Sequence, residues 1–397
     1  MKKIATIFGT RPDTIKMAPI IKELEKETDH FNVIKIATAQ HRQMLDQVLD
    51  VFDIKPDYDL NVMQTSQTLA EITKSTIVEL DKIFEIEKPD LVLVQGDTST
   101  TFIGSLAAFY QKIPVGHVEA GLRTNDKLNP FPEEINRRLT SVIADLHFAP
   151  TQTAKNALLN EKVLSEKIFI TGNSVIDALK YSVKNDHTFS QSMLNNIILQ
   201  DKNIILVTMH RRENLGEPMG NACKAIKSIA LNYPKYNIIF PVHLNPKVQT
   251  LVHSFLENIP NVFLIEPLDY LDFVNLMSKT YLILTDSGGV QEEGPFFGIP
   301  ILVLRELTER PEAIEFGTVK LVGLNEISIF SAADILLRDN KEYLKMAMAI
   351  NPYGDGLAAG RTVNVVKNYF GISRITINEF DPKSQKENSA QMIIFEN

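Results

Sequence analysis

Short apolar runs rich in isoleucine and valine alternate with helical patterns along almost the whole chain, and this alternation limits the possible folds more than any other feature. Runs that are apolar throughout are typical of strands in parallel sheets that helices cover on both faces. The first half of the chain predicts strands at Ile4–Phe8, Val33–Thr38, Leu91–Gln95, Val115–Val118 and His147–Ala149, with helices at Thr14–Lys26 and Arg42–Phe52. The second half predicts strands at Ile204–Thr208, Ile238–Val242, Val262–Ile265, Tyr281–Thr285 and Ile301–Leu304.

The series of strands starts again after the polar stretch Lys184–Gln191, so we predict two successive doubly wound α/β domains. A chain of 397 residues is long enough for both. We place an N-terminal Rossmann-like domain at residues 1–172 and a C-terminal one at 173–355, with the linker near Gly172-Asn173-Ser174. The sequence turns polar after Arg374, so we expect residues 375–397 to form a poorly ordered tail.

Charge and composition exclude several function classes. The net charge of −8 argues against a general nucleic-acid binder, which needs a basic face to displace counterions. Cys223 is the only cysteine, so no disulfide can form within the chain, and a reducing compartment fits. No apolar stretch approaches the roughly 20 residues of a membrane span, and Ile4–Phe8 is shorter than the core of an export signal. We therefore expect a cytoplasmic protein.

Polar motifs follow the predicted strands, where ligands of open parallel sheets bind. Gly9-Thr10-Arg11-Pro12 lies between the first strand and the first helix, and the helix N-terminus with Arg11 would attract an anion. Lys16 lies one turn further along that helix. The alternative is an ordinary strand–helix turn with a surface arginine.

Three acidic positions in the first half suggest acid–base chemistry. Asp97 follows the strand Leu91–Gln95, Glu119 ends the next strand, and Glu133 begins a helix after Pro130-Phe131-Pro132. Asp97 could instead be a helix N-cap. For the neighbouring Glu134, a solvated helix start remains the simpler interpretation.

The second half carries motifs suited to a phosphate and a base. His210 and Arg211 follow the strand Ile204–Thr208 and suit phosphate binding or proton transfer. The turn Thr285–Gly289 opens a helix that contains Glu292 and Glu293; its glycines would let a phosphate approach the backbone, and one glutamate could reach a ribose. A tight turn with an acidic first helical turn is the alternative.

Other cofactor and ligand signals are weaker. Phe273 lies in a predicted helix just after a strand and could pack on a base, whereas His243 is more simply a loop-anchoring residue. The chain contains neither the dinucleotide fingerprint nor the phosphate-loop lysine motif, so redox and nucleotide-hydrolysis functions lose their main support. Its eight histidines and single cysteine form no metal-binding pattern, and we expect no metal.

Taken together, the motifs resemble those of the bacterial non-hydrolysing UDP-N-acetylglucosamine 2-epimerases. The matching strings occur in order from Gly9 to about Tyr369: Gly9–Pro12, Gln40–Arg42, Gln95–Thr98, Gly116–Thr124, Pro130–Glu134, His210–Asn214, Pro241–Pro246, Thr285–Glu293, Thr308–Pro311 and Asn351–Gly356. Each string is weak by itself, but ten in register are specific.

The resemblance implies a fold and a set of site residues. The fold is the nucleotide-sugar glycosyltransferase B-type arrangement, with a cleft between two Rossmann-like domains and a C-terminal helix at about residues 356–372 packing back on the first. It implies catalytic roles for Asp97, Glu119, Glu133 and His210. It implies substrate contacts, most of them to UDP, from Arg11, Lys16, Phe273, Ser287, Gly288, Gly289, Glu293 and Arg310.

The resemblance also implies a reaction, in which UDP-N-acetylglucosamine and UDP-N-acetylmannosamine interconvert through a bound 2-acetamidoglucal without a redox cofactor. The product would supply cell-envelope polysaccharide synthesis, and relatives suggest a homodimer. Three alternative functions remain open: a UDP-sugar glycosyltransferase of the same fold, a hydrolysing epimerase, and a non-catalytic sensor of nucleotide sugars.

Some positions depart from the family pattern. Asp13-Thr14 stands where relatives usually have Glu-Ala, and Phe296-Phe297 replaces smaller residues. Many relatives bind a second substrate molecule as an activator, for which the matching positions include Gln40, Gln43, Glu133 and Arg211. An arginine usual at that site is Ser66 here, so we expect weaker activation.

Overall fold

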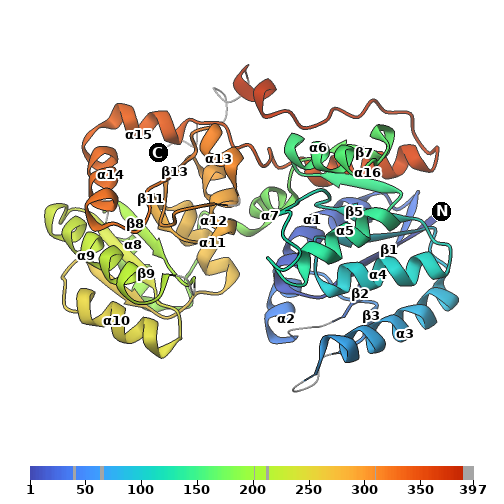
Figure 1. Ribbon diagram of the computed structural model, residues 1–397, viewed down its shortest axis with the longest axis horizontal. Coiled ribbons are helices and arrows are strands. Elements are labelled where there is room, and N and C mark those ends of the chain that lie inside the picture. Colours follow the sequence, from blue (N-terminus) through green and yellow to red (C-terminus); the bar gives the residue numbers. More distant parts are fainter. Residues whose placement is uncertain (39–41, 63–66, 201, 212–213, 309, 388–397) are drawn as a thin grey trace. The chain divides into compact units, whose positions relative to one another are not determined.

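The computed structural model describes residues 1–38, 42–62, 67–200, 202–211, 214–308 and 310–387. It divides the chain into two compact units, each built on one sheet (Figure 1). Unit 1 comprises Met1–Tyr181 and Tyr353–Asp381, and unit 2 comprises Ser182–Pro352 with the described residues after Asp381.

Unit 1 is a seven-stranded sheet in the order β3-β2-β1-β4-β5-β6-β7, and every neighbouring pair is parallel. Its strands are β1 (Lys2–Phe8), β2 (Phe31–Ala37), β3 (Tyr58–Asp59), β4 (Leu91–Gln95), β5 (Val115–Val118), β6 (Leu146–Ala149) and β7 (Ile168–Ile170). Its helices are α1 (Arg11–Lys26), α2 (Arg42–Val51), α3 (Leu69–Glu87), α4 (Ser99–Tyr110), α5 (Glu133–Ile143), α6 (Gln152–Asn160), α7 (Ser174–Ser182) and α16 (Ala358–Tyr369).

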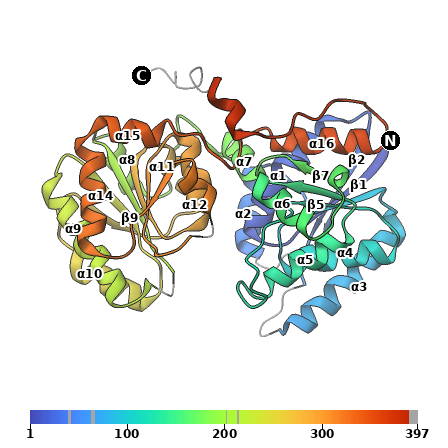
Figure 2. The same cartoon turned by 45° about the horizontal axis from the view of Figure 1, so that its top comes forward.

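Helices cover both faces of this sheet, which explains why its central strands are apolar throughout. Helix α4 packs between α3 and α5 on one side, whereas α1 packs against α2 and α16 on the other (Figure 2). The core between the sheet and the first group of helices includes Ile7, Leu80, Phe84 and Val94, all of them buried.

Unit 2 repeats the plan with a six-stranded parallel sheet in the order β10-β9-β8-β11-β12-β13. Its strands are β8 (Ile204–Thr208), β9 (Asn237–Pro241), β10 (Val262–Ile265), β11 (Thr280–Thr285), β12 (Ile301–Val303) and β13 (Val319–Leu321). Its α-helices are α8 (Ser192–Ile198), α9 (Glu217–Asn232), α10 (Pro246–Leu256), α11 (Tyr270–Ser278), α12 (Gly288–Glu293), α13 (Pro311–Glu315), α14 (Glu326–Arg338) and α15 (Asn340–Ala347).

The structure confirms the predicted class of two doubly wound α/β units. Each predicted strand is present within a few residues of its predicted bounds, whereas β3, β7 and β13 were missed. Each of these three is a short strand at the edge of its sheet. Strands of two or three residues offer too few positions for a hydrophobic pattern to stand out. Among the described residues, none of the helices has the length and apolar character needed to cross a membrane.

The segment predicted to link the two domains belongs to unit 1 in the structure. The Asn173 N–H donates to the Tyr353 carbonyl at 2.7 Å, and the Ser174 hydroxyl donates to the Lys16 carbonyl at 2.6 Å. Asp177 accepts the N–H groups of Ala358 and Ala359, so it caps the start of α16. These contacts hold α7 in unit 1, and the division falls after Tyr181 rather than after Gly172.

The expectation of a poorly ordered chain from Arg374 onward does not hold for Glu379 and Phe380. The Phe380 N–H donates to the Ile170 carbonyl at 2.8 Å, and the Ile170 N–H donates to the Glu379 carboxylate at 3.0 Å. Phe380 is buried, and the Arg361 guanidinium lies over its ring. This segment therefore covers the edge of the sheet at β7, an edge that would otherwise expose unpaired backbone groups.

Candidate functional site

The predicted residues of unit 1 gather where three neighbouring strands end. Strand β1 lies between β2 and β4, and β4 pairs with β5, so the turns after β1, β4 and β5 open on one edge of the sheet. The half-buried Arg11 and Lys16 come from α1 after β1, Asp97 follows β4, and Glu119 follows β5. The strand order reverses between β1 and β4, which is where open α/β sheets bind ligands.

The Glu119 carboxylate is held by three side chains. Lys16 Nζ forms an ion pair with Oε1, Asn173 Nδ2 donates to the same oxygen at 3.0 Å, and Gln95 Nε2 donates to Oε2 at 2.8 Å. Glu119 also has a φ of 62°, a left-handed conformation that is uncommon outside glycine. A strained backbone persists only where the surroundings fix it, and such positions cluster at functional sites.

Asp97 is bound from helix α5 rather than acting as a helix cap. Arg137 forms an ion pair with Asp97 Oδ2, and Asn136 Nδ2 donates to the Asp97 carbonyl at 3.0 Å. The N-cap of α4 is Thr98, so the capping alternative for Asp97 does not hold. The turn before Asp97 is fixed as well, because neutral His117 donates from Nε2 to the Gly96 carbonyl at 2.7 Å; burial lowers the pKa of His117 to about 3.

The two glutamates at the start of α5 have different surroundings. Glu134 is buried and accepts the N–H groups of Thr124 and Asn125, and it also pairs with two arginines of α5, so its role is structural. Glu133 is half-buried and lies one turn before Arg137, the partner of Asp97. Residues four apart share a helix face, so Glu133 lies on the face of α5 that contacts Asp97.

Asp13 is a buried acid that the sequence analysis did not single out as functional. It completes a capping box with Thr10, and it also accepts a hydrogen bond from the Thr98 hydroxyl at 3.0 Å. Burial raises the pKa of Asp13 to about 7; the hydrogen bonds from Thr10 and Thr98 oppose the shift, and the charge of Asp97 adds to it. The spacing Thr10-x-x-Asp13 signals a helix cap, but it gives no sign that the cap is buried beside a second carboxyl group.

We expect Asp13→Asn to stabilise the protein increasingly as the pH rises. The pKa of Asp13 is about 7 in the fold and 3.8 as its ordinary value, so the wild type loses stability as the pH rises from about 4 through 7. An asparagine keeps the acceptor for Thr10 and Thr98 but does not ionise. The gain in the free energy of unfolding should be about 2 kcal/mol larger at pH 8 than at pH 5.

Urea unfolding at the two pH values tests this expectation, with Asp29→Asn as the control because Asp29 is exposed in the same unit. A gain of equal size at both pH values, or a larger gain at pH 5, would show that Asp13 is ionised in the fold throughout this range.

In unit 2, a fully buried aspartate organises the histidine motif. Asp286 follows β11 and accepts the backbone N–H groups of His210 and Arg211 at 3.0–3.1 Å and the Asn214 side-chain N–H at 2.9 Å. His210 Nδ1 lies 3.3 Å from Asp286 Oδ1, while the imidazole is 46% exposed. His210 follows β8, the neighbour of β11, so both residues lie where the strand order of this sheet reverses.

The turn after Asp286 leads into α12. Ser287 is its N-cap and makes no side-chain capping bond. A Cβ atom placed on Gly288 would lie 3.8 Å from the Arg211 guanidinium, and one on Gly289 would lie 3.4 Å from the Glu293 carboxylate. Four of the residues predicted to contact UDP, Ser287, Gly288, Gly289 and Glu293, therefore lie together at α12, and Arg211 lies beside Gly288.

The remaining predicted contacts of unit 2 lie nearby in the fold or on α11. Arg310 forms an ion pair with Glu292, which is buried, and this places Arg310 beside α12. Phe273 is half-buried on α11. Of the predicted activator residues, Gln40 and Ser66 lie outside the described residues, as does the side chain of Gln43.

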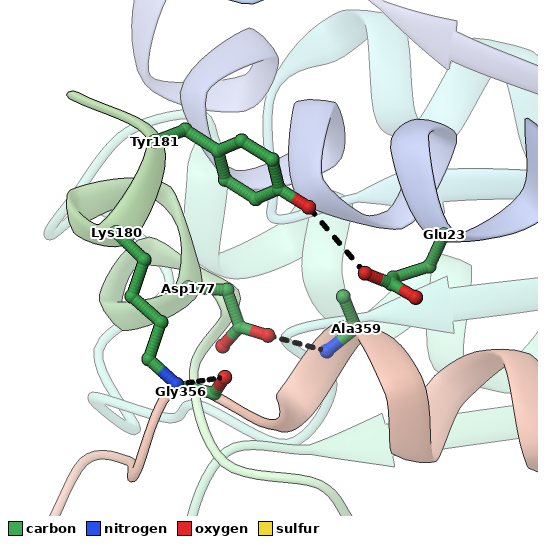
Figure 3. A pocket seen from close by; sticks show the side chains of 6 residues that line it. All are labelled: Glu23, Asp177, Lys180, Tyr181, Gly356 and Ala359. Atoms are coloured by element: carbon green, nitrogen blue, oxygen red, sulfur yellow. Dashed lines mark hydrogen bonds between the residues drawn. The ribbon is translucent and has the colours of Figure 1, made fainter. Parts of the chain in front are cut away.

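A pocket with a cavity of about 270 Å³ occurs elsewhere in unit 1 (Figure 3). It is lined by Glu23, Asp177, Lys180, Tyr181, Gly356 and Ala359. The Lys180 ammonium donates to the Gly356 carbonyl at 2.7 Å, and Asp177 points toward the N–H of Ala359. None of the predicted site residues lines this pocket. Within the described part of the chain, no group of three or more histidine, cysteine, aspartate or glutamate residues is arranged to hold a metal ion.

Comparison with known proteins gives a consistent result. The model of a family described as UDP-N-acetylglucosamine 2-epimerase matches residues 22–367. A UDP-N-acetylglucosamine 2-epimerase of Bacillus subtilis is 53% identical over 381 residues, which cover 96% of this chain and 99% of that protein.

Comparison with solved structures points to the same family. The UDP-GlcNAc 2-epimerase of Neisseria meningitidis bound to UDP-GlcNAc is 50% identical with a TM-score of 0.81, covering 92% of this chain and 100% of that one. The S. aureus MnaA–UDP co-structure is 51% identical with a TM-score of 0.83, covering 96% and 100%. The family match and this similarity over nearly the full length confirm the resemblance drawn from the motifs. The chain belongs to the UDP-N-acetylglucosamine 2-epimerase family.

Proposed function

We propose that the protein interconverts UDP-N-acetylglucosamine and UDP-N-acetylmannosamine by eliminating UDP and adding it back. The hydrogen on C2 of the sugar is not acidic while UDP is attached. Breaking the C1–O bond first leaves the electron pair on UDP and positive charge at C1, and a carboxylate can then take the C2 proton. The resulting 2-acetamidoglucal receives a proton on the opposite face of C2, and UDP bonds to C1 again.

The acid–base set of unit 1 is the observation that carries this proposal. An inversion at C2 needs two groups that exchange protons on opposite faces of the ring. Glu119 is held as the partner of Lys16, Asp97 is paired with Arg137, and Glu133 lies on the same face of α5 as Arg137. Fixed donors and cations keep these carboxylates in place before the substrate binds.

Unit 2 would hold the leaving group. We assign the diphosphate to Ser287, Gly288 and Gly289 with the help of His210 and Arg310, the ribose to Glu293, and the base to Phe273. Arg11 and Lys16 would contact the substrate from unit 1. The co-structures of relatives with UDP and with UDP-GlcNAc support a uridine diphosphate sugar as the substrate. Cationic and N–H groups around a departing diphosphate stabilise the charge that develops on it.

The wider setting is part of the same proposal. We infer that the enzyme works in the cytoplasm as a homodimer. Its product would feed synthesis of a cell-envelope polysaccharide. Activation by a second substrate molecule near Gln40, Gln43 and Arg211 would be weaker than in relatives with an arginine in place of Ser66.

A single experiment separates this proposal from its rivals. UDP-N-acetylglucosamine is incubated with the protein in D2O and followed by proton NMR. We expect deuterium at C2, a mixture that contains UDP-N-acetylmannosamine, and little free UDP. A hydrolysing epimerase would release UDP and free N-acetylmannosamine, and a glycosyltransferase would release UDP only with an acceptor present. A sensor would change nothing, and a C2 hydrogen that never exchanges would refute the proposal.

A further inference from the structure

Asn173 lies at the point where the outgoing and returning parts of the chain meet inside unit 1. It precedes α7, and its N–H donates to the carbonyl of Tyr353, the first residue of the returning segment. Asn173 is only 4% exposed. The pattern Gly172-Asn173-Ser174 predicts a linker, but a linker residue would not need a buried amide side chain.

The oxygen and the nitrogen of the Asn173 side-chain amide form hydrogen bonds with different partners. Oδ1 accepts the Val175 N–H at 3.1 Å, in the first turn of α7. Nδ2 donates to Glu119 Oε1 at 3.0 Å. The acceptor therefore supports the helix start, and the donor supports a carboxylate that follows strand β5.

The next residue, Ser174, contacts Lys16, which forms an ion pair with Glu119. The Ser174 hydroxyl donates to the Lys16 carbonyl at 2.6 Å, and the Lys16 ammonium pairs with Glu119. One short segment thus contacts both Lys16 and Glu119. With Gln95 on Oε2 and Asn173 on Oε1, each carboxylate oxygen has an amide donor, which fixes the plane of the carboxylate.

We propose that Asn173 is a positioning residue for the epimerisation, which orients the Glu119 carboxylate through its side-chain N–H. The inference rests on the proposed function and adds a residue to it. Glu119 has a left-handed backbone that does not by itself select one direction for the side chain, so the surrounding donors must select it. A reacting carboxylate displaced by about 1 Å can cost about 100-fold in rate.

The substitution Asn173→Asp distinguishes the orientation of the Glu119 carboxylate from the capping of α7. An aspartate caps a helix as well as an asparagine does, so the bond to the Val175 N–H is kept. The donor to Glu119 is replaced by an oxygen of like charge. We expect kcat for epimerisation to fall by at least about tenfold, while KM changes by less than about threefold.

The pH dependence of kcat provides a second measurement. A purely structural role of Asn173 would leave it unchanged. Among the described residues, the titratable groups near Glu119 include its partner Lys16 and Asp13 from α1 and His117 from β5, and the charge of Asp97, after β4, acts on Asp13. Asn173→Asp removes a hydrogen bond that favours the ionised carboxylate and adds a negative neighbour. The acidic limb of the kcat profile should therefore move to higher pH by about one unit.

The matched control is Asn325→Asp, the same substitution at the asparagine N-cap of α14, where Oδ1 accepts the N–H groups of Ile327 and Ser328. It should keep the wild-type kcat and the wild-type pH profile of kcat.

If Asn173→Asp does not fold, the variant Asn173→Ser keeps a capping oxygen and lacks the charge. Its kcat should still fall at least about tenfold. A folded variant with kcat within threefold of wild type and an unmoved profile overturns the inference. A wild type that exchanges no C2 hydrogen overturns the proposed function instead.

Discussion

Replacing Asp97 with asparagine is expected to lower kcat for epimerisation by about 100- to 10,000-fold, the usual contribution of a positioned acid or base. The substitution keeps the size of the side chain and removes its ability to exchange a proton. The turn should keep its place, because Asn136 binds the Asp97 carbonyl and Arg137 still has Glu134 within 3.4 Å. Binding of UDP-N-acetylglucosamine, measured by calorimetry, should therefore weaken by less than about fivefold.

Asp29→Asn, an exposed position of the same unit, is the control and should match the wild type in both measurements. Near-normal turnover in Asp97→Asn would remove Asp97 from the catalytic set. Loss of substrate binding together with turnover would instead assign Asp97 to holding the substrate.

The fold was predictable because its central strands are long apolar runs. Strands such as β1, β4, β8 and β11 are buried on both faces, so they contain no polar alternation that could be confused with an exposed sheet. The short β3, β7 and β13 carry no such signal. The boundary between the units was predicted too early, because Asn173 and Ser174 look like a turn and their buried contacts involve residues distant in sequence.

The candidate site was partly predictable for a similar reason. Asp97, Glu119 and His210 come one or two residues after apolar strands, and within each sheet parallel strands bring such positions to one edge. The residues that hold them could not be found in this way: Asn173, Arg137 and Asp286 act through side-chain contacts across 40 to 76 positions in sequence. Asp286 lies within a motif that the sequence analysis assigned to phosphate binding, but nothing in the spacing shows that its side chain faces inward.

Of the substitutions proposed above and below, removal of the Asp286 carboxylate should lower the free energy of unfolding the most. In Asp286→Ala, the backbone N–H groups of His210 and Arg211 and the side-chain N–H of Asn214 lose their shared acceptor, which is fully buried. Buried donors left unpaired are costly, and we expect the free energy of unfolding to fall by about 3 kcal/mol. Asp286→Asn keeps one oxygen and the shape but loses the charge, so its loss should be smaller.

The chain has no tryptophan, so unfolding in urea is followed by circular dichroism, and hydrogen exchange then reports which unit opens. Faster exchange should be confined to unit 2, around β8 and β11, which His210 and Asp286 follow. Glu315→Ala, an exposed position of the same unit, is the control and should change stability by less than about 0.5 kcal/mol. If Asp286→Ala were as stable as this control, water would have to satisfy the donors around His210. The turn after β8 would then be held by its own backbone, and kcat should survive the substitution as well.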